Sequence, residues 1–364
     1  MNDRHASRRS AVAEQLAGLG AAALLVTDLR NVAYLTGFHG SAGVVLLYAD
    51  GEAVLCTDSR YELQVAEQAP GVAHVITREY VADALRHGHA PVAPLAVQAD
   101  HLTLAAATRV RDALAGSDAA VGLVESRGLV EEVRRHKDEV ELRSIARACT
   151  VVDEAWTALL DRRLLGAGRT EREVAAELEH AMRRAGSEGV SFDTIVASGP
   201  NGALTHHVPS DRELTDGDLV VVDFGALVDG YASDCTRTVA VGEVSGTLRE
   251  IYEVTLRAQL AGVGAVRPGI GCAELDAVSR SVIADAGYGE YFGHSLGHGV
   301  GLDVHEAPSV ASKATGTLAV GDVVTVEPGI YLPGRGGVRI EDTVAVLPDG
   351  HRVLTTTSKQ LVVL

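Results

Sequence analysis

The feature that most constrains the fold is an internal repeat of about one hundred residues in the C-terminal part of the chain. The segment "GDLVVVDFG" recurs as "GDVVTVEPG" at an offset of 104 residues, and "TVAV" recurs at an offset of 105. The pattern "EREVAAELEHAMRRAG" resembles "CAELDAVSRSVIADAG" at an offset of 101, and "GALTHHVPS" resembles "GLDVHEAPS" at an offset of 99. Because these pairs occur in the same order, the repeat predicts two copies of a helix, helix, strand, strand unit related by a pseudo-two-fold axis.

The repeat also superposes residues that can carry chemistry. Asp223 corresponds to Glu327, and His206 corresponds to His305. A duplication that served only the hydrophobic core would not need acids and histidines at equivalent positions. We therefore expect these side chains to belong to a functional site, with the two histidines on opposite sides of a cleft.

Asp223 and Asp234 lie on two apolar segments, "VVVDFGAL" and "YASDCTRTVAV". If these form a hairpin that turns near residues 228–230, both acids lie on one sheet face, roughly 4.5 to 8 Å apart. Two carboxylates so close need a shared proton, a basic partner or a metal ion. Two simpler interpretations stay open: an Asp after a strand often only forms a turn, and Arg237 is a possible partner for one acid.

Two more acids follow the same pattern. Glu327 ends the apolar run "VVTVE", and Glu341 lies in "VRIEDTVAV". Arg339 is two residues from Glu341 and so on the same face of a strand, where it can balance one charge. Two divalent cations would neutralise four carboxylates, and oxygen ligands suit manganese, cobalt, iron or zinc better than a thiolate-binding ion.

The segment "FGHSLGHGVGLDVHEAP" supplies candidate nitrogen ligands, His294 and His298. Its four glycines between residues 293 and 301 make a helix improbable, which argues against a metalloprotease H-E-x-x-H helix. The glycines instead suggest that backbone comes close to a ligand. The alternative is that each histidine is a hydrogen-bonded structural residue.

The first part of the chain has a different pattern, in which helices and strands alternate. Two strands joined by a turn at Asp50-Gly51 are predicted, with helices near residues 61–68 and 104–114. A plausible linker lies at residues 126–128. We therefore predict an α/β domain over residues 1–127 and a second domain over residues 128–364.

Charge and cysteine content restrict the class of protein. With 32 Lys and Arg against 49 Asp and Glu, the net charge of −17 argues against a nucleic-acid or anionic-membrane partner. The four cysteines are far apart, which indicates neither a disulfide framework nor a zinc ribbon. No apolar run approaches the roughly 18 residues of a membrane span, so a cytoplasmic protein is predicted.

Taken together, "DFG...SDCTRT", "GHGVGLDVHEAP", "VEPGIY" and "VRIED" resemble the pita-bread metallopeptidases, which include methionine aminopeptidase, aminopeptidase P, prolidase and the metal-free creatinase. The segments "NVAYLTGFHGSAG" and "TDSRY" resemble the amino-terminal domain of the aminopeptidase P, prolidase and creatinase branch, which methionine aminopeptidases generally lack. The resemblance implies an α/β N-terminal domain and an α+β pita-bread C-terminal domain with an internal pseudo-two-fold repeat.

The resemblance implies five metal ligands. Asp223 would chelate one ion, Asp234 and Glu341 would bridge two ions, and His298 and Glu327 would hold the second. All five are present, which argues against a creatinase-like protein. The implied cofactor is a pair of divalent ions, manganese first, with cobalt, zinc or iron as alternatives.

The resemblance also implies a hydrolytic mechanism. A hydroxide that bridges the ions would attack the peptide carbonyl, with Glu327 as the proton shuttle. His305 would donate to the carbonyl oxygen and His206 would contact the scissile bond, while His294 would line the pocket for the following residue. Arg339 would orient the metal-bound acids beside the substrate.

The implied substrates are peptides with proline at the second position. Prolidases often carry an Arg soon after the "VHE-x-P" segment, and this chain has Ser309 there. We therefore expect an Xaa-Pro aminopeptidase (aminopeptidase P), with Xaa-Pro dipeptidase (prolidase) as the alternative and a non-catalytic peptide-binding module as a remote one. Homodimers are common among the proteins that this chain resembles, so we expect a homodimer.

Overall fold

The computed structural model describes residues 4–87, 94–115 and 122–364, which divide into two compact units. The units are Met1–Arg134 and Arg135–Leu364. The predicted domain boundary after residue 127 lies at the turn that precedes helix α6 (Leu129–Arg135). Each unit has its own buried core and is described separately.

The first unit contains a six-stranded sheet in the order β4-β3-β2-β1-β5-β6. Strands β2 and β3 are antiparallel on either side of the predicted turn at Asp50-Gly51, whereas β1 pairs with β5 in parallel. The alternation of strands and helices confirms the α/β prediction. The bounds are α1 (Arg4–Leu19), β1 (Ala23–Val26), α2 (Leu29–Thr36), β2 (Val44–Tyr48), β3 (Ala53–Thr57), α3 (Glu62–Gln68), β4 (Ala73–Ile76), α4 (Tyr80–Arg86), β5 (Leu95–Gln98), α5 (Leu104–Ala115) and β6 (Leu123–Ser126).

The second unit contains the predicted repeat. Its first half is α7 (Glu139–Asp161), α8 (Glu171–Arg184), β7 (Gly189–Val190), β8 (Ile195–Ser198), β9 (Leu219–Phe224), β10 (Ala226–Val228), β11 (Tyr231–Ala232) and β12 (Cys235–Ala240). Its second half is α9 (Gly246–Ala265), α10 (Cys272–Asp285), β13 (Gly297–Gly299), β14 (Glu306–Val310), β15 (Val323–Val326), β16 (Gly329–Leu332), β17 (Gly336–Arg339), β18 (Asp342–Leu347) and β19 (Gly350–Val353).

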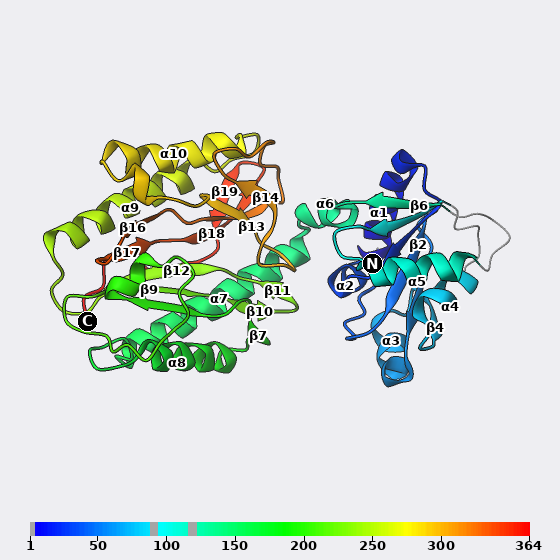
Figure 1. Cartoon of the computed structure of the whole chain (residues 1–364), viewed down its shortest axis with the longest axis horizontal. Helices are drawn as coiled ribbons and strands as arrows, with labels where there is room; N and C mark the ends of the chain where they lie inside the picture. Colours follow the sequence, from blue (N-terminus) through cyan, green and yellow to red (C-terminus); the bar gives the residue numbers. More distant parts are fainter. Residues whose placement is uncertain (1–3, 88–93, 116–121) are drawn as a thin grey trace. The chain divides into compact units, whose positions relative to one another are not determined.

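Each half packs two helices on its own strands. Apolar residues of α7 and α8 form one core with β9 and β12, and those of α9 and α10 form another with β15 and β18. In Figure 1 the two helix pairs lie on opposite sides of the strands. The helices begin at local signals: α7 and α8 each have a capping box, at Asp138 and Thr170 respectively. The predicted pita-bread architecture with its internal repeat is confirmed.

Within the described ranges, none of the helices combines the length and the apolar character that a membrane crossing requires.

Candidate metal centre

The hairpin between β9 and β12 sets the spacing of Asp223 and Asp234. Its turn is Asp229-Gly230, where both residues have positive φ, 52° and 76°, as in the type I′ turns that suit strand twist. In the ladder, Thr236 lies opposite Asp223. Because strand side chains alternate, Asp234 lies on the face of Thr236, one diagonal from Asp223. The prediction of two acids on one sheet face is confirmed.

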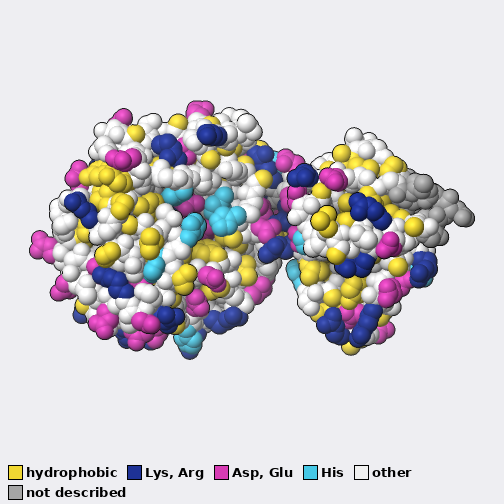
Figure 2. Space-filling model, in the orientation of Figure 1, with side chains coloured by type: hydrophobic (Ala, Val, Ile, Leu, Met, Phe, Trp, Pro, Cys, Tyr) yellow, Lys and Arg dark blue, Asp and Glu magenta, His cyan; other side chains and the backbone are white. Residues whose placement is uncertain are grey.

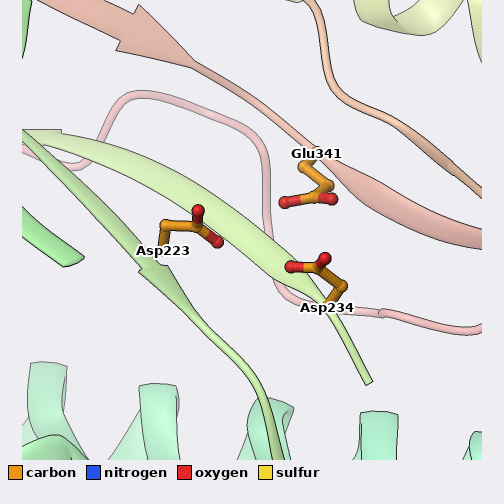
Figure 3. Close-up of side chains that lie close together, drawn as sticks. All are labelled: Asp223, Asp234 and Glu341. Carbon is orange, nitrogen blue, oxygen red and sulfur yellow. The ribbon is translucent and has the colours of Figure 1, made fainter. Parts of the chain in front are cut away.

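A third carboxylate, from the second half of the repeat, joins this pair. One oxygen from each of Asp223, Asp234 and Glu341 lies within 4.8 Å of the others, and Figure 3 shows the three side chains turned toward one another. The side chains of Asp234 and Glu341 are buried. The cluster therefore combines ligand types and spacing that suit a divalent cation.

Asp223 and Glu341 each use one carboxylate oxygen in a hydrogen bond and keep the other for a cation. Asp223 Oδ2 accepts from Arg339 Nη2 at 2.6 Å, and Glu341 Oε2 accepts from Thr236 Oγ1 at 2.7 Å. The other oxygens, Asp223 Oδ1 and Glu341 Oε1, are buried without a hydrogen-bond partner among the described residues. Leaving a buried carboxylate oxygen unpaired is costly, and a bound cation would remove this cost.

His298 and Glu327 extend the cluster. His298 Nε2 lies 3.5 Å from Asp234 Oδ2 and 3.4 Å from Glu327 Oε1. Its Nδ1 lies 3.0 Å from the carbonyl oxygen of Gly299, which places the proton on Nδ1 and leaves the Nε2 lone pair for a metal ion. Burial lowers the pKa of His298 to about 4, so the ring is neutral at pH 7.

Without a cation, ionisation of the buried acids Asp234, Glu341 and Glu327 is unfavourable. Burial raises the pKa of Asp234 and of Glu341 well above the usual range, and neighbouring carboxylates raise both further. Burial also raises the pKa of Glu327 to about 8, although Arg339 opposes this rise. Four crowded carboxylates and a neutral imidazole therefore fit divalent ions, which would favour the ionised acids.

The glycines on either side of His298 lie against the backbone of neighbouring strands. The predicted absence of a helix is confirmed, since residues 293–301 contain strand β13 (Gly297–Gly299) and no helix. A Cβ on Gly297 would lie 2.0 Å from the oxygen of Thr325, and one on Gly299 would lie 2.2 Å from the oxygen of Ala307. These two glycines therefore let β13 lie close to the backbones of β15 and β14, and Gly297 also lines the pocket of the site.

The structure brings all predicted site residues to one pocket of about 740 Å³ in the second unit. Figure 2 shows histidine side chains gathered on one face of this unit. The predicted residues that line the pocket are His206, Asp223, Asp234, His294, His298, His305, Glu327, Arg339 and Glu341.

Two of the three predicted substrate histidines, His294 and His305, differ in their surroundings. His294 is held at both nitrogens, by the carbonyl oxygen of Ser295 at 2.8 Å and by the hydroxyl of Tyr331 at 2.9 Å. Burial lowers the pKa of His294 to about 4, and Arg339 adds to the effect. The ring of His305 packs on that of His298, with centroids 4.1 Å apart. His305 is therefore next to the candidate ligands, whereas His294 lines the pocket with its ring held in one orientation.

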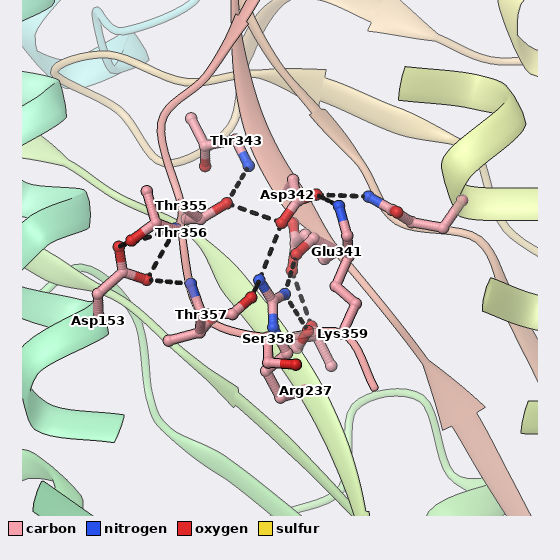
Figure 4. A network of polar contacts seen from close by, with 12 residues as sticks. Asp153, Arg237, Glu341, Asp342, Thr343, Thr355, Thr356, Thr357, Ser358 and Lys359 are labelled. Carbon is pink, nitrogen blue, oxygen red and sulfur yellow. Dashed lines mark hydrogen bonds and ion pairs between the residues drawn. The ribbon is translucent and has the colours of Figure 1, made fainter. Parts of the chain in front are cut away.

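The two arginines that were possible partners of the acids have separate roles. Arg339 bonds to Asp223, from the other half of the repeat, and donates to the hydroxyl of Tyr331 at 3.0 Å. Arg237 instead bonds to Asp342 Oδ1 at 2.9 Å, in the network of Figure 4. The alternative in which Arg237 balances Asp223 or Asp234 is therefore wrong, because its guanidinium points away from them to Asp342.

Sequence reasoning assigned no role to three residues of this region, Tyr331, His207 and Glu171. Tyr331 links His294 to Arg339, and its presence at the end of the quoted motif "VEPGIY" was the available signal. His207 lines the pocket beside His206, and its Nε2 lies 2.7 Å from Glu171 Oε2. No local pattern predicts that contact, because the partners are 36 residues apart.

Comparison with known families agrees with this geometry. Residues 143–348 match the model of metallopeptidase family M24, and residues 8–136 match that of the creatinase/prolidase N-terminal domain. The chain belongs to metallopeptidase family M24. Membership of M24 implies divalent metal ions at the site, while manganese as the particular metal stays a prediction.

Individual M24 relatives match over nearly the whole chain. An uncharacterized peptidase of Bacillus subtilis is 40% identical, over 95% of this chain and 97% of its own length. The solved structure of an Xaa-Pro dipeptidase from Bacillus anthracis is 39% identical, with a TM-score of 0.93, covering 99% of this chain and 100% of that one. An X-Pro aminopeptidase from Thermotoga maritima is 34% identical, with a TM-score of 0.87, covering 97% and 99%.

Proposed function

We propose that this protein is a metal-dependent Xaa-Pro dipeptidase. The observation that carries the proposal is the likeness, along essentially the whole chain, to the Bacillus anthracis Xaa-Pro dipeptidase, together with a complete set of candidate ligands in one pocket. A prolidase of Pyrococcus horikoshii, 35% identical with a TM-score of 0.90 over 98% of this chain and 100% of that one, supports the same activity.

The proposed ligands are the five predicted residues, Asp223, Asp234, His298, Glu327 and Glu341. Divalent cations held there would polarise the substrate carbonyl and lower the pKa of water. The remaining work falls to side chains of the pocket.

Glu327 is the proposed proton carrier, because its carboxyl lies among the candidate ligands, with Oε1 3.4 Å from His298 Nε2. His305 and His206 are the proposed donors to the substrate carbonyl and the scissile bond. His294, fixed at both nitrogens, would bound the space for the residue after that bond.

The expected preference for aminopeptidase P is not confirmed, and the dipeptidase alternative has more support. The expectation depended on Ser309, a neutral residue at a position where prolidases often carry Arg. Yet Arg172 also lines the pocket. Its side chain is 63% exposed and pairs with Asp211 at 2.9 Å, and we propose it as a partner for a substrate carboxylate in place of an arginine at position 309.

An assay matrix tests the proposal. Xaa-Pro dipeptides and Xaa-Pro-Yaa tripeptides are compared with manganese, cobalt or zinc after exhaustive removal of other metals. A dipeptidase should turn over the dipeptide at least about tenfold faster, since its pocket uses the free carboxylate after proline. The opposite ratio would favour an aminopeptidase, and a metal-loaded protein inert on both would favour a peptide-binding module.

A homodimer stays the expected assembly. Light scattering during size-exclusion chromatography should give a mass near twice the chain mass of 38.0 kDa.

A further inference from the structure

The segment between β8 and β9 carries His206 but has little regular structure of its own. Residues 199–203 form one short 3₁₀ turn, followed by two more backbone hydrogen bonds, Leu204 N to Asn201 O and His207 N to Leu204 O. The His206 side chain reaches the pocket from this segment. Its position must therefore be set by contacts with other elements.

One buried carboxylate makes most of those contacts. Glu171, the first residue of α8, is completely buried, and each of its oxygens accepts three hydrogen bonds. Oε1 accepts from Ser198 N at 2.8 Å, Ser198 Oγ at 2.7 Å and Asn201 Nδ2 at 3.0 Å. Oε2 accepts from His207 Nε2 at 2.7 Å, Ser210 N at 3.0 Å and Ser210 Oγ at 2.6 Å. Glu171 thus binds both ends and the middle of segment 198–210.

The charge of Glu171 is secure. Burial alone would raise its pKa, but hydrogen bonds from Ser210, Ser198 and Asn201 outweigh burial and lower the pKa to about 2. Hydrogen bonds to an ionised carboxylate are about twice as strong as those between neutral groups. The N-terminus of α8 adds two more contacts. Glu171 N donates to Arg212 O, and Arg172 N donates to Ser210 O, both at 3.1 Å.

The opposite side of the segment rests on β17. A Cβ on Gly337 would lie 2.0 Å from the oxygen of Gly202, so the two backbones are in direct contact. Arg339 Nη1 donates to Thr205 O, the residue before His206, at 3.3 Å. His206 is therefore held between a neighbour bound to Arg339 and a neighbour bound to Glu171.

We propose that Glu171 is the positioning residue of His206: by fixing segment 198–210 on α8, it sets the place of the His206 imidazole in the pocket. The kinetic consequence rests on the proposed function, whereas the structural consequence does not.

The structural arm measures hydrogen exchange by mass spectrometry on Glu171→Gln and wild type. The amide has nearly the same shape, but its NH₂ group cannot accept the hydrogen bonds that one oxygen now receives. Exchange in residues 199–210 should accelerate by about tenfold or more, with no change in helix α10. Glu141→Gln is the matched control, because Glu141 is also a buried carboxylate, bound to Asp138 N and the Tyr231 hydroxyl outside this segment.

Ser210→Ala provides a milder variant should Glu171→Gln fail to fold. It removes the hydrogen bond from Ser210 Oγ to Glu171 Oε2 and the one that Ser210 Oγ accepts from Arg212 N, but keeps the other bonds to Glu171, so a smaller acceleration in the same segment is expected. Unchanged exchange in residues 199–210 in both variants, or in the one that folds, would overturn the proposal.

The kinetic arm uses metal-loaded protein and an Xaa-Pro dipeptide. Glu171→Gln should lower kcat by about tenfold with unchanged metal content, but should lower it less than about twofold in a His206→Ala background, since the two residues act through one group. Equal losses in both backgrounds would refute an action through His206. Failure of the proposed function would appear as wild-type inactivity, and the exchange arm would still decide the positioning.

Discussion

Asp234 lies close to three other candidate metal ligands, His298, Asp223 and Glu341. Its Oδ2 faces His298 at 3.5 Å, and it shares a 4.8 Å cluster with Asp223 and Glu341. Asp234→Asn is therefore expected to remove most bound metal and activity while the fold is kept. Because the substitution removes one buried carboxylate from a crowded group, the chelated variant should melt no lower than the chelated wild type. Elemental analysis, activity and thermal unfolding check this, and full activity with intact metal content would contradict it.

His305 is the histidine whose ring packs on a candidate ligand, His298. As the proposed donor to the developing oxyanion, it should be needed for turnover but not for metal binding. We expect His305→Ala to lower kcat by more than about tenfold with metals retained. The exposed His74 in the first unit supplies the control, as His74→Ala should leave kcat unchanged. Unchanged turnover in His305→Ala would place the oxyanion on another side of the site.

At the scale of elements, strands β12 and β18 meet where the repeat brings equivalent positions together. Thr236 donates to Glu341 and Arg237 pairs with Asp342, and both pairs are separated by 105 residues, the offset of the repeat. Equivalent positions can contact each other only beside the axis that relates the two copies. The candidate ligands therefore lie beside the pseudo-two-fold axis, with acids supplied by both halves.

This junction depends on a buried ion pair. Asp342 is fully buried and receives Arg237, Gln259, Thr355 and Lys359, as Figure 4 shows for the labelled members. Asp342→Asn leaves the buried Arg237 without its counter-charge, so we expect unfolding to become easier by about 3 to 5 kcal/mol. Urea denaturation measures this.

Glu139→Gln, which removes one partner of the exposed pair with Arg143, is the control for the Asp342 change. It should have little effect, because solvent screens exposed pairs. A loss of stability as small in Asp342→Asn as in this control would show that the junction does not depend on the ion pair.

At the scale of the whole molecule, the metal-free protein should have an unusual pH profile. Glu327, with its pKa raised from 4.5 to about 8, ionises more easily when unfolded, so stability falls as pH rises from 4.5 through about 8. Glu171, with its pKa lowered to about 2, has the opposite sign and loses its contribution as pH falls below 4.5. The pKa values of Asp234 and Glu341 are also raised, so both acids act in the same direction as Glu327, whereas His294 and His298, with pKa values lowered to about 4, add stability as pH rises to 6.5. The melting temperature of the chelated protein should therefore fall most steeply between about pH 6.5 and 8.

Added divalent metal should abolish the alkaline loss, because the bound ion favours the ionised acids. Chelated protein whose melting temperature does not fall between about pH 6.5 and 8 would contradict the crowding of the acids.

The two units should be separable. All proposed ligands and both cores of the repeat lie after residue 134. We expect a fragment of residues 128–364, the proposed second domain, to fold and bind metal. Circular dichroism and elemental analysis check this, and an unfolded or metal-free fragment would show that the second unit requires the first.

Sequence alone determined the repeat, the hairpin and the positions of the acids, because those depend on local periodicity. Strand alternation placed Asp223 and Asp234 on one face, and the repeat offset related Glu327 to Asp223. The α/β class of the first unit was predictable for the same reason, since alternating helix and strand patterns are local.

Tertiary structure alone decided the side-chain partners. Arg339 bonds to Asp223 rather than to Glu341, which does not share its strand because β17 ends at Arg339 and β18 begins at Asp342. Arg237 turns to Asp342. Glu171 reaches His207 across 36 residues. Such contacts depend on how helices, strands and loops pack within each half and between the halves. Side chains that are distant along the chain leave no periodic trace in sequence. The ligand types of the site were therefore readable from the chain, but the bonds that hold them in place were not.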